Sequence, residues 1–175
     1  MADEAAVADA LASARLRPCE HCHRAGTLVG HGRLVGYAEA SSAREVRGLR
    51  LYCSNRHRRV GCGRTFAVWL ASIVPRRIVR ARTVFTFMVA MATGESAARA
   101  WRQASSMTLR TGYRIKARLA IAGPAIRSAL LSRAPPPSTA SASPDAQLVA
   151  HLCAVLGPLD SFSSYQLAFE RSLFA

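Results

Sequence analysis

The chain has 175 residues, which is enough for one domain or for two very small ones. Half of the residues are apolar, too many for a wholly disordered chain, but only 7% are aromatic. Any core is therefore built mostly from Ala, Val and Leu, and a large catalytic fold is not expected. The formal net charge of +14 favours a partner that carries many negative charges.

No stretch of the sequence predicts a membrane span. The longest apolar runs, such as residues 84–92, reach about half of the roughly 20 residues that a spanning helix needs. The N-terminus carries Asp3, Glu4 and Asp9, whereas a secretory signal begins with a positively charged segment. We therefore expect a cytoplasmic protein with no membrane partner.

The basic charge is concentrated in one region of the chain. Residues 44–118 contain 17 of the 24 basic residues and only two acidic ones, Glu45 and Glu95. Each Lys or Arg that reaches a phosphate releases condensed counterions, so such a region is typical of proteins that bind nucleic acid. Every basic residue except Lys116 is arginine, which indicates either bidentate phosphate contacts or a genome with GC-rich codons. Nucleic acid as partner implies association with the nucleoid.

The N-terminal part of the chain changes from a helical to a strand-like composition. Residues 1–17 are Ala-rich with apolar residues at helical spacing, which predicts a helix or a disordered arm. Residues 18–74 are rich in Cys, His, Gly and Arg. Within them lie short apolar pieces that we expect to form strands joined by turns, around residues 28–29, 49–52 and 66–70.

Helical patterns dominate the rest of the chain. Residues 75–133 begin with a basic connector and then fit three or four helices, with interruptions expected at Gly94, Gly112 and Gly123-Pro124. The segment 134–144, APPPSTASASP, has the composition of a linker. Residues 145–175 predict a tail of two short helices, 145–156 and 161–174, broken at Gly157-Pro158.

Four of the five cysteines have the spacing of metal ligands. Cys19 and Cys22 form a CxxC pair, and Cys53 and Cys62 follow about 30 residues later. In a cytoplasmic chain such pairs indicate a metal site before disulfides, and four thiolates satisfy the tetrahedral preference of zinc. The alternative is a redox-active CxxC, but no βαβ pattern surrounds it and the second pair would have no role. Cys153 is expected to be a small buried apolar residue.

The fourth ligand has two candidates. Cys53 and Cys62 are separated by eight residues, whereas a knuckle normally leaves two to four, so His57 competes with Cys62 for the position. The flanking Gly61 and Gly63 favour Cys62, because they permit a tight turn directly before an apolar strand. His21 and His23 are interpreted as exposed loop residues.

The string LYCSNRHRRVGCGRTF at residues 51–66, together with the CxxC pair, a Gly-rich strand pair and a basic helical segment, resembles a known family. It is similar to the zinc ribbon plus helix-turn-helix at the N-terminus of bacterial insertion-sequence transposases and of small transposase-like proteins. The resemblance covers roughly residues 18–133, and GCGRTF is its most specific part. Two features depart from the family: residues 54–61 lengthen the second knuckle, and His23 stands where the family usually has Gly.

The helical segment fits a helix-turn-helix. Residues 83–92 are apolar nearly all round, as expected of a supporting helix, and Ser96 can cap a second helix that contains Trp101, interpreted as a core residue. After a turn at residues 105–107, Thr108 can cap a third helix that runs through Leu119. This helix carries Arg110, Arg114 and Arg118 at i, i+4 and i+8, a spacing that indicates either a recognition helix in the major groove or a solvated face.

The sequence therefore predicts a small α+β protein: a zinc ribbon of short antiparallel strands, a helix-turn-helix unit and a short helical tail. Acidic residues beyond the helical unit, Asp145, Asp160 and Glu170, are too few and too poorly placed for a nuclease triad, so no enzyme activity is expected. Partners are duplex DNA, and a transposase or a second copy through the C-terminal helices. Alternatives are an RNA- or ribosome-binding zinc ribbon and the remnant of a full transposase. The predicted nucleic-acid contacts are Arg56, Arg58, Arg59, Arg76, Arg77, Arg80, Arg82, Arg110, Arg114, Lys116 and Arg118.

Overall fold

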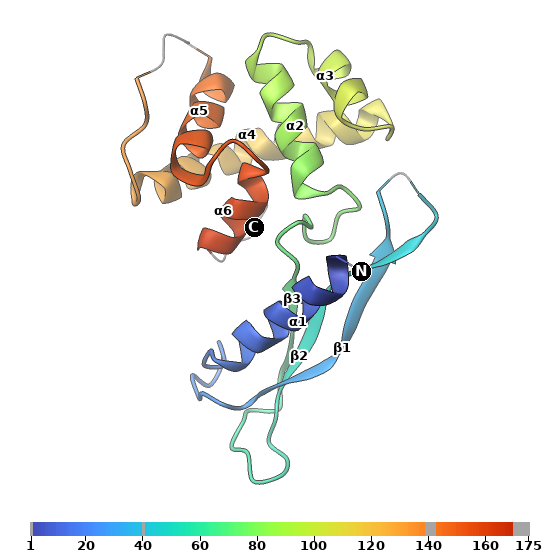
Figure 1. Cartoon of the computed structure of the whole chain (residues 1–175), viewed down its shortest axis with the longest axis vertical. Coiled ribbons are helices and arrows are strands. Elements are labelled where there is room, and N and C mark those ends of the chain that lie inside the picture. The colour runs from blue at the N-terminus through green and yellow to red at the C-terminus, as the bar shows by residue number, and fades with distance from the viewer. Residues whose placement is uncertain (1, 40, 139–142, 170–175) are drawn as a thin grey trace. The chain divides into compact units, whose positions relative to one another are not determined.

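The computed structural model describes residues 2–39, 41–138 and 143–169. Within these described ranges, one helix, three strands and five further helices follow one another, so the predicted small α+β class is confirmed (Figure 1). The chain divides into two compact units, residues 1–70 and residues 71–175.

The first unit is a three-stranded antiparallel sheet with a helix against one face. Strands β1 (Leu28–Tyr37), β2 (Arg44–Cys53) and β3 (Thr65–Trp69) lie in the order β1-β2-β3, and each contains one of the apolar pieces that predict a strand. Helix α1 (Ala2–Arg15) packs on β1 and β2, where Leu11 meets the backbone of Gly30. Gly30 pairs with buried Leu51, so α1 covers the apolar face of the sheet.

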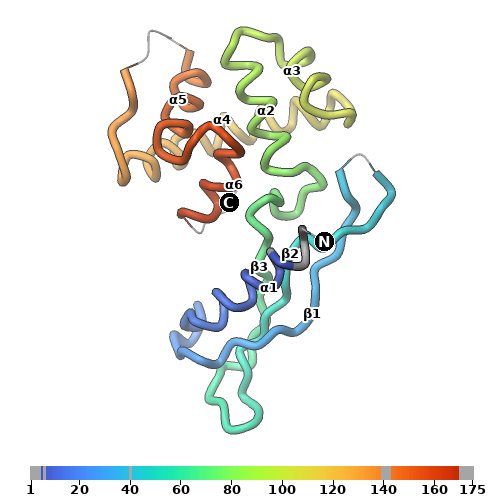
Figure 2. The backbone as a smooth tube through the Cα atoms, in the orientation of Figure 1, coloured from blue at the N-terminus to red at the C-terminus, as the bar shows by residue number. Residues whose placement is uncertain are grey.

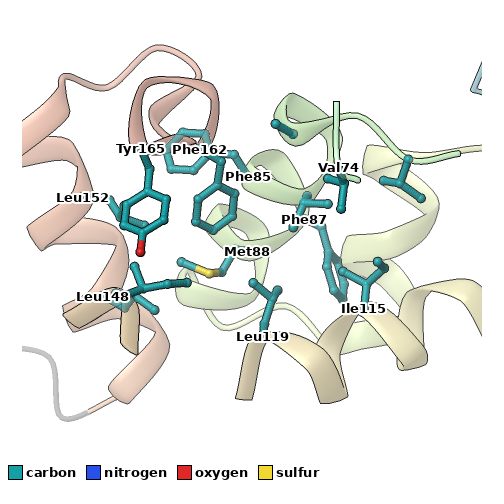
Figure 3. Close-up of a cluster of buried hydrophobic side chains, with 14 of the residues drawn as sticks. Val74, Phe85, Phe87, Met88, Ile115, Leu119, Leu148, Leu152, Phe162 and Tyr165 are labelled. Atoms are coloured by element: carbon teal, nitrogen blue, oxygen red, sulfur yellow. The ribbon is translucent and has the colours of Figure 1, made fainter. Parts of the chain in front are cut away.

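The second unit is a bundle of five helices around one core. Its elements are α2 (Ala81–Ala92), α3 (Ala97–Ala104), α4 (Leu109–Leu131), α5 (Pro144–Leu156) and α6 (Ser161–Phe169). Figure 3 shows Phe85, Phe87 and Met88 of α2 meeting side chains of the other helices at the centre of this core. Phe87 contacts the ring of Trp101 edge to face, with the ring centroids 5.2 Å apart, so Trp101 is a core residue as predicted.

Helices α5 and α6 belong to this core, whereas the sequence predicted a separate tail beyond a linker. Leu148 and Leu152 of α5 and Phe162 of α6 are buried against the α2 helix. His151 Nε2 also lies 2.9 Å from the carbonyl of Ala134, which joins α5 to the end of α4. The expected break at 157–158 separates the two helices, and residues 170–174 of the predicted second helix lie outside the described residues.

Helix α4 is longer than the sequence predicts. The expected interruption at Gly123-Pro124 is wrong, because the helix runs without a break from Leu109 to Leu131. A proline disfavours helical geometry in the preceding residue partly through that residue's Cβ, and Gly123 has none. Pro124 cannot donate to the carbonyl of Ala120, but both residues are exposed, so water can reach this carbonyl.

Gly112 is required by the contact between α3 and α4. A Cβ atom placed on Gly112 would lie 2.4 Å from Cγ of Trp101, far inside van der Waals contact. The glycine, which by propensity alone weakens a helix, thus allows the buried indole to rest directly on the α4 backbone. The indole Nε1 also donates to the carbonyls of Met107 and Thr108, at 3.0 Å each, which ties α3 to the turn before α4.

We expect Gly112→Ala to destabilise the second unit. Overpacking costs about 1–3 kcal/mol, and three atoms of Trp101 lie within 2.9 Å of the added Cβ, so we expect a cost in the upper part of this range. That cost is larger than the gain of roughly 1 kcal/mol in helix propensity. Thermal or urea unfolding followed by circular dichroism measures the difference. The exposed substitution Lys116→Ala on the same helix serves as control and should change the free energy of unfolding by less than about 0.5 kcal/mol. A Gly112→Ala variant at least as stable as the parent would contradict the packing argument.

Candidate metal centre

The four cysteines expected as ligands come together at one end of the first unit. The sulfur atoms of Cys19, Cys22, Cys53 and Cys62 all lie within 4.8 Å of one another. Two pairs are closer, with 3.8 Å from Cys19 Sγ to Cys62 Sγ and 3.7 Å from Cys22 Sγ to Cys53 Sγ. Tetrahedral coordination with metal–sulfur bonds near 2.3 Å places the sulfurs about 3.8 Å apart. The four cysteines are therefore close enough to hold a metal ion.

The first pair is presented by a tight turn at the start of the sheet. The backbone N–H of Cys19 donates to the carbonyl of Arg24 at 3.0 Å, and the N–H of His23 donates to the carbonyl of Cys19 at 2.8 Å. The N–H of His21 points at Cys19 Sγ, 3.4 Å away. His23 has a φ of 56°, in the left-handed region that glycine adopts most easily and that histidine tolerates better than most residues.

The second pair is held by a narrow neck that closes a long loop. At this neck the N–H of Cys53 donates to the carbonyl of Arg64 at 2.8 Å, and the N–H of Gly63 returns a bond to the carbonyl of Cys53 at 2.9 Å. Gly61 also donates to the carbonyl of Ser54 at 2.9 Å, and a Cβ on Gly61 would lie 2.3 Å from that oxygen. Residues 55–60 therefore leave the sheet and return, as Figure 2 shows, and Cys62 arrives beside Cys53.

This neck explains the unusual spacing of the second pair. His57 lies exposed on the loop between the two ends of the neck and is not part of the sulfur cluster. The structure thus brings Cys62, and not His57, to the other three cysteines. His21 and His23 are exposed, as predicted.

The thiols of the cluster do not ionise alike. Burial alone would raise the pKa of Cys53, but it is outweighed by hydrogen bonds with Thr27 Oγ1 and the N–H of Cys62, both at 3.2 Å, and by the thiols of Cys19 and Cys22. The pKa of Cys53 is lowered to about 6. For Cys62, the N–H of Arg64 lowers the pKa, but desolvation and the three neighbouring thiols together raise it to about 11. Cys53 therefore forms a thiolate readily, whereas Cys62 keeps its proton near neutral pH unless a cation lowers its pKa.

The predicted nucleic-acid contacts lie on several surfaces. Arg56, Arg58 and Arg59 are exposed on the loop between Ser54 and Gly61. Arg76 and Arg77 are exposed before α2, whereas the other two arginines of the basic connector belong to regular structure. Arg80 pairs with Ile73 in an isolated β-bridge and precedes α2, and Arg82 lies inside that helix.

Three arginines of α4 lie on the side of the helix that faces away from the core. Gly112, Ile115 and Leu119 are buried, whereas Arg110, Arg114 and Arg118 are exposed. Within the described part of the chain, no acidic group pairs with these three arginines. Lys116 is also exposed, but it lies four residues from Gly112 and three from Leu119, at the edge of the buried face and outside the arginine row.

Two large exposed side chains lie beside the row formed by Arg110, Arg114 and Arg118, and sequence reasoning missed them. Tyr113 is 55% exposed and Ile121 is 81% exposed, and both lie on the arginine side of α4. Helical spacing of apolar residues marks core positions, so the exposure of these two could be recognised only once the buried side of α4 was known.

The acidic residues of the second unit that the structure describes have local roles. Asp145 lies in the first turn of α5, and Asp160 Oδ1 accepts a hydrogen bond from the N–H of Ser163 at 3.4 Å before α6 begins. The four cysteines are the only group of metal-ligating side chains that meet among the described residues. Glu170 lies outside them.

No protein-family model, curated protein or solved structure matches the chain. Across the described residues, no helix is both long enough and apolar enough to cross a membrane. What the cysteine cluster and the arginine row can do therefore has to follow from their own geometry.

The neck predicts which residue completes the metal site. Cys62→Ser should lose bound metal, because it removes one of four convergent sulfurs, whereas His57→Ala should retain it. Metal content per chain after gel filtration, measured by elemental analysis, distinguishes the two variants. Retention of metal by Cys62→Ser together with its loss from His57→Ala would mean that His57 is the ligand.

Proposed function

We propose that the chain is a non-catalytic, zinc-dependent protein that binds duplex DNA, similar in layout to the ribbon and helix-turn-helix of insertion-sequence transposases. The observation that carries the proposal is the row of Arg110, Arg114 and Arg118 on the exposed side of α4, directly after the short helix α3. A helix with a cationic outer side, supported from behind by a second helix, fits the major groove of DNA.

The cysteine cluster supports zinc as the metal. Four thiolates form a soft donor set with the tetrahedral arrangement that zinc prefers. Such a site leaves no coordination position for water, which is typical of structural zinc and not of catalytic zinc. The left-handed conformation of His23 supports the resemblance, because glycine, which the family usually has at that position, adopts this conformation most easily.

The contact between α3 and α4 supports a rigid helix-turn-helix. Ser96 caps α3 by accepting a hydrogen bond from the N–H of Arg99 at 3.4 Å, and the indole of Trp101 holds the turn at Met107 and Thr108. Because Gly112 lies against the indole, the first turns of α4 have a fixed position relative to α3. Arg110 and Arg114 are therefore presented from a supported surface.

Zinc and folding are expected to be coupled in the first unit. Protein purified without chelator should contain about one zinc per chain. Chelation should unfold residues 18–70, since small ribbons depend on the ion, while α2 to α6 keep their own apolar core. Elemental analysis and amide hydrogen exchange with and without chelator measure both effects. Less than about half an equivalent of zinc in protein purified without chelator would overturn the prediction.

Two groups of arginines should differ in how their loss changes DNA binding. Arg110→Ala or Arg114→Ala should remove about 1–3 kcal/mol of discrimination between a selected site and random duplexes. Arg76→Ala or Arg82→Ala should weaken binding to all duplexes alike and lower the salt slope by roughly one unit, with Arg118→Ala behaving similarly. Affinities for a site selected from random duplexes, measured at several salt concentrations, test both expectations.

Two results would contradict the DNA proposal. An unchanged ratio of selected to random affinity in Arg110→Ala and Arg114→Ala would leave the arginine side of α4 as a solvated surface. Displacement of duplex DNA by equal amounts of RNA would favour the RNA- or ribosome-binding alternative.

A further inference from the structure

A cavity of about 620 Å³ opens on the first unit, and the metal site and the helix-turn-helix do not account for it. Its floor is a row of three residues across the sheet, since Val29 pairs with Tyr52 and Tyr52 pairs with Thr65. Paired residues of antiparallel strands point to the same face, and the next pair, Gly30 and Leu51, faces α1. The cavity therefore lies on the face of the sheet that α1 leaves uncovered.

A β-bulge adds an imidazole to this floor. The pairing of β1 with β2 skips His31, because Gly30 pairs with Leu51 and Gly32 pairs with Arg50. Bulges redirect side chains and are frequent beside functional sites. Here the bulge brings His31 to Tyr52, with the two ring centroids 5.7 Å apart, so two flat rings lie side by side in the cavity.

The loop closed by the neck supplies a cationic rim. Arg56, His57 and Arg59 line the cavity from this loop, and His57 has a φ of 52°, so the chain turns sharply at that point. Tyr52 Oη donates to Asn55 Oδ1 at 2.6 Å, which joins the floor to the start of the loop. The cavity has no carboxylate among its lining residues, so its fixed charge is positive.

We propose that this cavity binds one unpaired nucleotide, with its phosphate held by Arg56 and Arg59 and its base against the rings of Tyr52 and His31. Arginine pairs with phosphate through bidentate hydrogen bonds, and aromatic rings stack on any base. The volume is in the range of pockets that take a small ligand, and a base inside a duplex is already stacked and cannot enter. The nucleotide can belong to a single-stranded end or be a free mononucleotide. The inference extends the proposed binding of nucleic acid to a second site on the other unit.

The test measures the affinity of the full chain for three probes by calorimetry: a ten-nucleotide oligothymidylate, thymidine 5′-monophosphate and a blunt duplex. Arg59→Ala and His31→Ala should each weaken oligothymidylate binding by roughly tenfold, the scale of one lost charged hydrogen bond or one lost stacking contact. The control is Arg15→Ala, which removes the same charge from the last turn of α1, on the covered side of the sheet. It should change the affinity by less than about twofold. Equal metal content in all variants shows that the ribbon is still folded.

The outcomes separate this inference from the DNA proposal. If the mononucleotide binds as tightly as the oligonucleotide, the ligand is the free nucleotide, and if only the oligonucleotide binds, the ligand is a strand end. If Arg59→Ala and Arg15→Ala weaken oligothymidylate binding equally, binding depends only on net charge, and the cavity is not the binding site. Absence of binding to both single-stranded probes, with duplex binding intact, would overturn this inference alone. If the unsubstituted chain binds none of the three probes, both this inference and the DNA proposal are overturned.

Discussion

The first unit depends on an electrostatic requirement: four sulfur atoms have to lie within 4.8 Å of one another. As thiols they can do so, and Cys53 ionises readily, but desolvation and the three neighbouring thiols raise the pKa of Cys62 to about 11. Thiolates this close together would also repel one another. A divalent cation attracts every thiolate around it, and this attraction outweighs the repulsion between the thiolates. The end of β2, the start of β3 and the turn before β1 all meet at this point, so the cation that we propose would connect three segments far apart in the sequence.

The second unit has a different basis, because no group of metal-ligating side chains comes together among its described residues and an apolar core joins its helices. Helix α4 contributes to the unit on two sides. Ile115 and Leu119 enter the core, and Arg110 and Arg114 remain on the opposite side. The positions of the arginines are therefore fixed by the same contacts that stabilise the bundle.

The sequence was sufficient to predict those features that local patterns determine. The strands, the helices around residues 83–92 and 97–104, and the set of four cysteines follow from periodicity and spacing. It was insufficient where long-range contacts decide. Gly112 and Gly123-Pro124 suggest helix breaks by propensity. In the structure, Gly112 leaves room for Trp101, and Gly123 has no Cβ that would clash with the ring of Pro124. Likewise, residues 134–144 have a linker composition that conceals the packing of α5 and α6, and the cavity depends on a bulge that brings His31 to Tyr52.

The neck at Ser54 and Gly61 has a consequence for how this protein can change. Because the two ends of the loop are fixed to each other, the residues between them can vary in number without moving Cys53 or Cys62. The entropy of closing a flexible loop grows slowly with length, by roughly 0.6 kcal/mol for each doubling. Insertions and replacements at residues 55–60 are therefore inexpensive for the fold, and the rim of the cavity can change its shape and charge while the cysteine cluster stays as it is.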